Sequence, residues 1–178
     1  MESFVLLLEI LLPAIVVGAI AYLIIRSYLN YEEGRQALEI EKSKQDIIFP
    51  VRMQAYERIT LFLERVTPES LIRRVLKTNT SARLFQSDLI AIIRSEYEHN
   101  ISQQVYVSAN VWSMVKTATE ETIRLVNITG SKMPPSATAS DLAEQILHIT
   151  AQVSKFPTQV ALEQVKKEFS QYFLKSTT

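Results

Sequence analysis

The two histidines of the chain, His99 and His148, are the first residues to consider for chemistry. Glu96-x-x-His99 has the spacing of the metal-binding pairs in di-iron helical bundles, whereas Glu144 precedes His148 by four positions. At about 100° per helical residue, His99 lies about 160° from the apolar stripe centred on Tyr97, and His148 lies about as far from the stripe of its own helix. Both histidines are therefore predicted to point to solvent, and we predict no metal site.

Other catalytic chemistry lacks its usual sequence signals. The chain has no cysteine, which excludes disulfides, thiol catalysis and cysteine-based zinc sites. It also lacks a glycine-rich phosphate loop, a dinucleotide-binding glycine pattern and a nucleophile elbow. We therefore predict no catalytic residue and no cofactor.

A group of polar residues shares the inward side of one predicted helix. Asn100 and Gln104 fall within about 60° of Tyr97, and Glu96 lies just beyond. If this helix is continuous, these groups are partly buried and form a network or a polar pocket. The alternative is that the helix ends near Asn100, a plausible terminator. The candidate polar or interaction site comprises Glu96, His99, Asn100, Gln104, Tyr106 and Trp112.

The elements that position these residues are predicted to be helices. The 178 residues include three glycines, where typical usage gives roughly 12, so a turn-rich sheet fold is disfavoured. Apolar residues recur at helical spacing in several segments, for example at Leu89, Ile93 and Tyr97. We predict an all-α fold in which about five amphipathic helices bury their stripes in one bundle.

Capping residues predict where several helices begin. Thr67 followed by Pro68 has the order of an N-cap and a first helical position. Ser81 is the predicted N-cap of the helix that contains the polar group. Thr138-x-x-Asp141 matches the acidic form of a capping box at the start of a later helix.

Prolines and glycine predict interruptions. Pro50 predicts a helix boundary at Phe49, because the residue before a proline disfavours helical geometry. The range 127–137, which contains Gly130, is the predicted long loop. Pro157 is predicted to lie in the first turn of the last helix.

The N-terminal segment Phe4–Ile25 is strongly apolar, with one charge in 22 residues. As a helix it would be about 33 Å long, enough for the ~30 Å hydrocarbon core of a bilayer. A soluble core helix would show a polar stripe, which this segment lacks. A cleaved signal peptide would begin with basic residues, and the small residues Ala19 and Ala21 alone do not outweigh their absence. We predict a single transmembrane helix.

Four residues of this helix are notable. Pro13 removes one helical hydrogen bond and can kink the segment, and Glu9 is a carboxylate close enough to the outer end to reach water. Ala14 and Gly18 have the small-xxx-small spacing that lets two membrane helices approach closely.

The flanking charges predict the orientation. The C-terminal side carries Arg26, Arg35, Lys42 and Lys44, and the N-terminal side carries no basic residue. The positive-inside rule then places the N-terminus outside and the bulk of the chain in the cytoplasm. The predicted organisation is an anchor over 1–25, a juxtamembrane helical linker over 26–50 and an α-helical domain over 51–178. The linker holds fewer than three heptads, so coiled-coil pairing there stays open.

Two strings of residues are similar to a known group of proteins. QAYERITLFLERVTPE over 54–69, and EHNISQQVYVS over 98–108 followed by Trp112, resemble a family of uncharacterised bacterial proteins. The resemblance covers most of the chain. It implies an N-terminal anchor in a bacterial inner membrane and a helical cytoplasmic domain, but no activity, ligand or catalytic residue.

Charge bears on the expected partners. Lys+Arg and Asp+Glu are 19 each, so the total charge does not indicate a nucleic-acid-binding protein. The range 52–94 has eight basic and four acidic residues, a surplus suited to a solvated face or to anionic groups. We expect a membrane-bound interaction or scaffold protein with the lipid bilayer, protein partners or a second copy as its partners. A ligand-binding module or enzyme with a pocket near Glu96, Asn100 and Gln104 is the alternative.

Overall fold

The structure is a computed structural model that describes residues 2–77 and 79–173. The side chains of 2–14, 33–34, 36–38, 40–46 and 173 also lie outside this description. The described part holds seven helices and no strand, which confirms the predicted all-α class. In chain order they are α1 (Glu2–Val66), α2 (Pro68–Val75), α3 (Ala82–Asn100), the 3-10 helix η1 (Ile101–Val105), α4 (Ala109–Ser131), α5 (Ala139–Ala151) and α6 (Pro157–Phe173).

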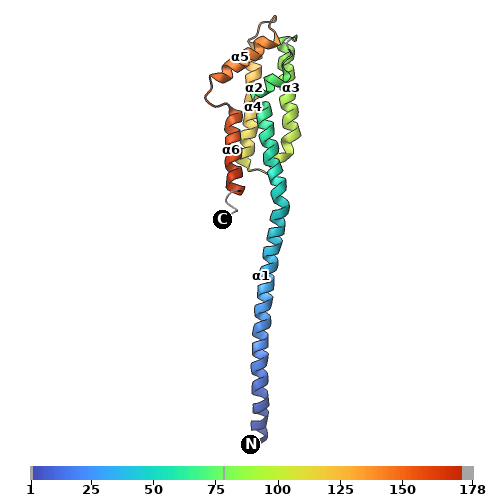
Figure 1. The fold of residues 1–178 in the computed structure, drawn as a ribbon, viewed down its shortest axis with the longest axis vertical. Coiled ribbons are helices and arrows are strands. Elements are labelled where there is room, and N and C mark those ends of the chain that lie inside the picture. The colour runs from blue at the N-terminus through green and yellow to red at the C-terminus, as the bar shows by residue number, and fades with distance from the viewer. Residues whose placement is uncertain (1, 78, 174–178) are drawn as a thin grey trace. The chain divides into compact units, whose positions relative to one another are not determined.

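The chain divides into two compact units, Met1–Phe49 and Pro50–Thr178. The second unit is a helical bundle. Within it, the last part of α1 runs lengthwise beside α3, α4 and α6, while α2 and α5 lie at the end of the bundle where α1 stops (Figure 1).

Two apolar clusters form the core of the second unit. The first joins the last part of α1 to α4 and α6 through side chains such as Phe62, Val111 and Val165. The second joins α2, α3, α4 and α5 through side chains such as Phe85 and Leu142. Because α4 contributes to both clusters, it connects the two ends of the bundle.

Local capping explains where the helices begin. The hydroxyl of Ser81 accepts a hydrogen bond from the backbone N–H of Leu84 at 3.3 Å, as the sequence predicted for the start of α3. Thr138 and Asp141 form the predicted capping box of α5. A short antiparallel bridge between Ser81 and Thr138 ties these two helix starts together.

The start of α2 differs in its detail from the prediction. The helix begins at Pro68, as expected, but the side chain of Thr67 makes no capping hydrogen bond. Its hydroxyl instead donates to the backbone carbonyl of Glu64, at 2.5 Å. Pro157 stands at the first position of α6, as predicted.

Two predicted interruptions are wrong. Helix α1 passes through Pro50, because an exposed proline costs one backbone hydrogen bond but does not force the helix to end. Helix α4 continues to Ser131, and Gly130 lies inside it rather than in the loop predicted over 127–137. Buried Val126 and Thr129 hold this last part of α4 against the bundle, so tertiary packing outweighs the helix-breaking tendency of glycine.

The predicted transmembrane segment lies within α1. Within the described residues, no helix combines enough length with enough apolar character to pass through a bilayer. The side chains of Glu9, Pro13 and Ala14 lie outside the described residues. Gly18 is described, and nothing lies within 4 Å of the position that a Cβ atom would take there.

Candidate interaction groove

The end of α3 decides between the two predicted alternatives for the polar group. Helix α3 stops at Asn100 and the 3-10 helix η1 follows at Ile101, so the structure has the alternative in which the α-helix ends near His99 and Asn100, and an α-helix continuous to Gln104 is excluded. The Asn100 side chain is buried, and its Nδ2 donates to the carbonyl of Glu96 at 2.8 Å. Helix η1 follows, and Ser108 then caps α4 by accepting from the N–H of Val111.

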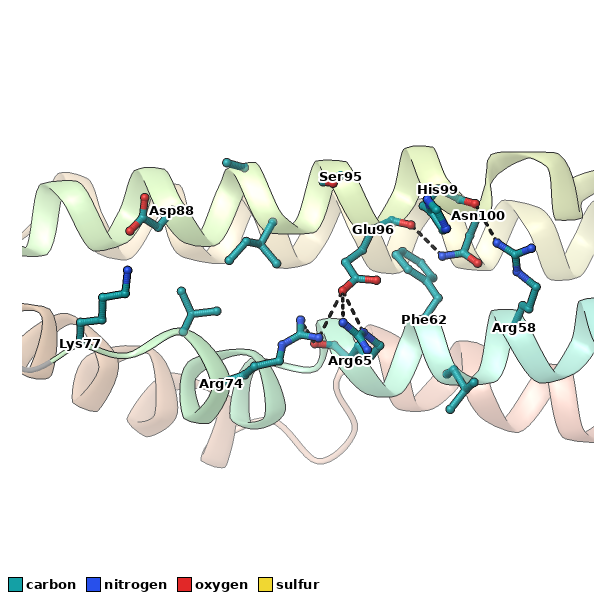
Figure 2. A pocket seen from close by; sticks show the side chains of 14 residues that line it. Arg58, Phe62, Arg65, Arg74, Lys77, Asp88, Ser95, Glu96, His99 and Asn100 are labelled. Atoms are coloured by element: carbon teal, nitrogen blue, oxygen red, sulfur yellow. Dashed lines mark hydrogen bonds and ion pairs between the residues drawn. The ribbon is translucent and has the colours of Figure 1, made fainter.

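A groove of about 920 Å³ lies between α3 on one side and the ends of α1 and α2 on the other. Figure 2 shows the side chains that line it. They are Arg58, Leu61, Phe62, Arg65, Arg74, Val75, Lys77, Asp88, Ala91, Ile92, Ser95, Glu96, His99 and Asn100. Three of the predicted site residues, Glu96, His99 and Asn100, are therefore brought together in one concave surface.

Two arginines meet one carboxylate across this groove. Glu96 points from α3 toward Arg65 of α1 and Arg74 of α2 (Figure 2). Its Oε1 accepts from Arg65 Nη2 at 2.7 Å, from Arg65 Nε at 2.8 Å and from Arg74 Nη1 at 3.2 Å. The Glu96 side chain is 20% exposed, and those of Arg65 and Arg74 are 54% and 34% exposed. Glu96 and both arginines are thus accessible from water.

Arginines also bind backbone carbonyls at the helix ends beside the groove. Arg74 Nη2 donates to the carbonyl of Arg65 at 3.3 Å, at the end of α1. Arg58 Nη2 donates to the carbonyl of His99 at 3.1 Å, at the end of α3. The last carbonyls of a helix have no partner within it, so these contacts satisfy them and hold the arginines at the groove.

Apolar side chains lie among the charged ones. Leu61 is 54% exposed, Ile92 is half-buried, and Val75 and Phe62 are buried lining residues. The groove therefore offers both apolar contact and guanidinium groups.

The histidines are exposed, as predicted. His99 is an exposed residue that lines the groove, and His148 lies on the exposed side of α5. The His148 Nε2 has the side chain of Gln152 as a neighbour at 3.4 Å. Among the described residues, no group of three or more His, Asp or Glu side chains could hold a metal ion.

The other predicted site residues lie elsewhere. Gln104 is exposed in η1, and Tyr106 follows η1 and accepts at its carbonyl from Arg52 Nε at 3.1 Å. Trp112 is half-buried and stacks on Tyr97, with the ring centroids 5.7 Å apart. We interpret Trp112 as a packing residue of the first apolar cluster rather than as part of the groove.

A second polar centre, which sequence reasoning missed, surrounds the buried Glu168 of α6. Its Oε1 accepts from the Tyr56 hydroxyl at 2.7 Å and from the Ser108 N–H at 3.0 Å, and its Oε2 accepts from the Ser108 hydroxyl. Burial alone would raise the pKa of Glu168, but the hydrogen bonds from Ser108 and Tyr56, with the charge of Arg52, outweigh it and lower the pKa. Burial and the Glu168 carboxylate together raise the pKa of Tyr56.

This second centre is structural in character. It joins α1 and α6 to the residue that caps α4, and Arg52 lies 4.3 Å from the ring centroid of Tyr172 nearby. Because Glu168 is 7% exposed, a solute has little access to the carboxylate.

The chain is similar to one known family over nearly its whole length. Residues 2–172 match the group described as "Family of unknown function (DUF7935)". The chain belongs to this family. Neither the curated proteins nor the solved structures include a match.

The DUF7935 match contains every residue of the groove and of the Glu168 centre. It confirms the coarser part of the resemblance, a domain of unknown function over nearly the whole chain. The membrane anchor and the bacterial origin stay predictions.

Proposed function

We propose that this protein is a single-pass membrane protein whose helical bundle binds a protein partner at the groove between α1, α2 and α3. In this proposal it is a scaffold or interaction protein rather than an enzyme. The anchor lies in a bacterial inner membrane, with the N-terminus outside and the bundle in the cytoplasm.

Composition and flanking charge support the anchor. The segment Phe4–Ile25 carries one charge, and all 19 basic residues of the chain lie at or after Arg26. Within the described side chains, Val17 is 66% exposed and Ile24 is 63% exposed. Exposed apolar side chains in a run of this kind suit contact with lipid.

The anchor can be tested by alkaline extraction of membranes that contain the full chain. We expect the wild-type chain to stay with the membrane, and the double variant Ile15→Arg, Val16→Arg, at exposed positions in the middle of the predicted span, to be released. Each arginine near the middle of a membrane helix costs about 2.5–3.5 kcal/mol of insertion free energy. The control is Ile47→Arg with Ile48→Arg, which places the same charges on exposed residues outside the predicted span. A wild-type chain that is freely soluble after cell breakage would contradict the anchor.

The observation that carries the interaction proposal is the groove itself. It brings accessible arginines and the exposed Leu61 onto one concave surface made by three helices. Protein interfaces favour arginine and apolar anchors in such recessed surfaces.

Site-specific photocrosslinking in intact membranes tests this surface. A photoreactive residue at position 61 lies in the groove, and one at position 128 is the control, because Ile128 is also exposed but lies on α4 outside the groove. We expect a discrete protein adduct from position 61 and none from position 128. The absence of a specific adduct at position 61 would contradict the proposal.

A further inference from the structure

The groove carries more positive than negative charge. Four basic side chains line it, Arg58, Arg65, Arg74 and Lys77, against the two acidic ones, Asp88 and Glu96. The difference is therefore two positive charges on one concave surface. An occupant with negative charge would be attracted to it.

Glu96 shows how an incoming carboxylate could be held. Its Oε1 accepts hydrogen bonds from the guanidinium groups of both Arg65 and Arg74, at nitrogen–oxygen distances of 2.7 to 3.2 Å. Each guanidinium has five N–H donors, and the contacts with Glu96 and with the carbonyl of Arg65 use only part of them. A carboxylate of an occupant that displaces Glu96 can take the donors that Glu96 uses and those that remain, in the geometry that arginine and carboxylate groups favour.

The apolar residues of the lining limit which kinds of negatively charged ligand fit the groove. Leu61 and Ile92 stand beside the charged groups, so a small inorganic anion would leave this apolar surface uncovered. Sites for single-stranded nucleic acid combine a basic groove with aromatic rings on which successive bases stack, and the lining offers one exposed ring, that of His99, because Phe62 is 1% exposed. A protein segment with acidic and apolar side chains matches both parts of the lining.

We propose that the groove binds an acidic, amphipathic segment of a partner protein, and that the carboxylates of this segment replace Glu96 on Arg65 and Arg74. This inference rests on the proposed function, in which the groove is the partner site. Glu96 then acts as an internal competitor that occupies the arginines while the groove is empty.

A defined probe tests the inference with the full chain in detergent. The probe is a synthetic amphipathic helical peptide made of leucine, alanine and glutamate, and its matched control has glutamine in place of every glutamate. By fluorescence anisotropy, we expect the glutamate peptide to bind at least about tenfold more tightly than the glutamine peptide. Added salt should reduce this difference, because both arginines are accessible from water.

Charge variants with matched controls locate the binding site. Glu96→Gln should tighten binding of the glutamate peptide by about fivefold, because it frees both arginines. Its control is Glu120→Gln, which also removes one carboxylate from an ion pair, the pair with Lys116, but lies on α4. An equal gain from both variants would mean that net charge alone matters, and would overturn the inference.

Removal of positive charge should have the opposite effect. Arg65→Gln should weaken binding of the glutamate peptide by about fivefold, whereas Arg124→Gln, an exposed arginine paired with Glu121 on α4, should not. If Arg65→Gln fails to fold, Lys77→Gln is the second variant, because Lys77 is an exposed lining residue that takes no part in the Glu96 ion pairs. Unchanged affinity in a folded variant of either kind would overturn the inference.

Other ligands are outcomes of the same test. Two results would overturn the proposed protein segment. One is displacement of the peptide by inorganic phosphate at an equal concentration of negative charge, and the other is stronger binding to vesicles of anionic phospholipid than to the peptide.

Photocrosslinking separates this failure from failure of the proposed function. A partner adduct at position 61 that persists unchanged in Lys77→Gln would leave the interaction standing and overturn the acidic segment, and a second copy of the chain in that adduct would do the same. The absence of any adduct would contradict the proposed function itself.

Discussion

Glu168 is a buried carboxylate that stabilises the bundle as an anion. Its pKa is lowered, because the hydrogen bonds from Ser108 and Tyr56 and the charge of Arg52 favour the charged form more strongly than burial disfavours it. A carboxylate whose pKa is lower in the folded state contributes stability above its unfolded pKa, which is about 4.3 for glutamate. That contribution is lost as the pH falls through the lowered folded value.

We therefore expect Glu168→Gln to lower the free energy of unfolding near neutral pH by about 1–3 kcal/mol. Below about pH 4 the difference in unfolding free energy between the variant and the wild type should narrow, because protonation then makes the wild-type carboxyl group neutral like the glutamine. Denaturant unfolding at both pH values measures this difference. The pKa of Asp141 is also lowered, by hydrogen bonds from Thr138, but Asp141 titrates in both proteins and cancels. A difference that stays constant with pH would contradict the role of the anion.

Thr158 is a buried residue whose hydroxyl has no hydrogen-bond partner among the described residues. Thr158→Val removes this hydroxyl at nearly constant volume, so we expect the free energy of unfolding to rise by about 1 kcal/mol. The matched control is Thr122→Val, because the buried Thr122 hydroxyl donates to the carbonyl of Ala118 at 2.8 Å. Thermal unfolding measures the stability of both variants against the wild type. Equal destabilisation by Thr158→Val and Thr122→Val would contradict the expectation.

At the scale of elements, capping decides where α5 begins. The Thr138 hydroxyl accepts from the N–H of Asp141 at 3.3 Å, and an Asp141 oxygen accepts from the N–H of Thr138 at 2.8 Å. Thr138→Ala should lower the free energy of unfolding by about 1 kcal/mol, because an N–H of the first turn loses its partner. Thr117→Ala, at an exposed position inside α4, should be neutral or slightly stabilising. Equal effects in denaturant unfolding would show that the capping box contributes nothing.

Local signals made much of the element pattern predictable. Ser81 and the Thr138–Asp141 pair cap helices through neighbours three residues away, so the sequence alone contains the whole interaction. Asn100 could be recognised as a terminator for the same reason, although the apolar stripe left a continuous helix open. The boundary predicted at Phe49 was wrong. The free-energy cost of Pro50 within a helix depends on its exposure and on the rest of α1, which a rule about the residue before a proline does not include.

The groove could be predicted only in part. Glu96, His99 and Asn100 were found from one helix, but Arg65 and Arg74 lie 31 and 22 residues before Glu96 and approach it only through packing of three helices. The basic surplus over 52–94 was the one signal for these arginines. The Glu168 centre left no such signal, because Tyr56 and Glu168 are 112 residues apart.

At the scale of the whole molecule, each unit has one task in the proposed function. The first unit, Met1–Phe49, contains the predicted anchor, and the second, Pro50–Thr178, contains the groove. A protein held at a membrane meets partners at a raised local concentration, so a modest affinity at the groove suffices for lasting contact.

Cysteine labelling in membranes shows whether a partner fills the groove. The chain has no cysteine, so Leu61→Cys and Ile128→Cys each introduce a single reactive thiol at an exposed position, in the groove and outside it respectively. Maleimide labelling rates are compared between native membranes and the detergent-purified chain. We predict that the thiol at position 61 reacts several-fold more slowly in membranes than after purification, because a partner covers it, while the thiol at position 128 reacts equally in both. Equal rates at position 61 in the two preparations would contradict a partner-filled groove.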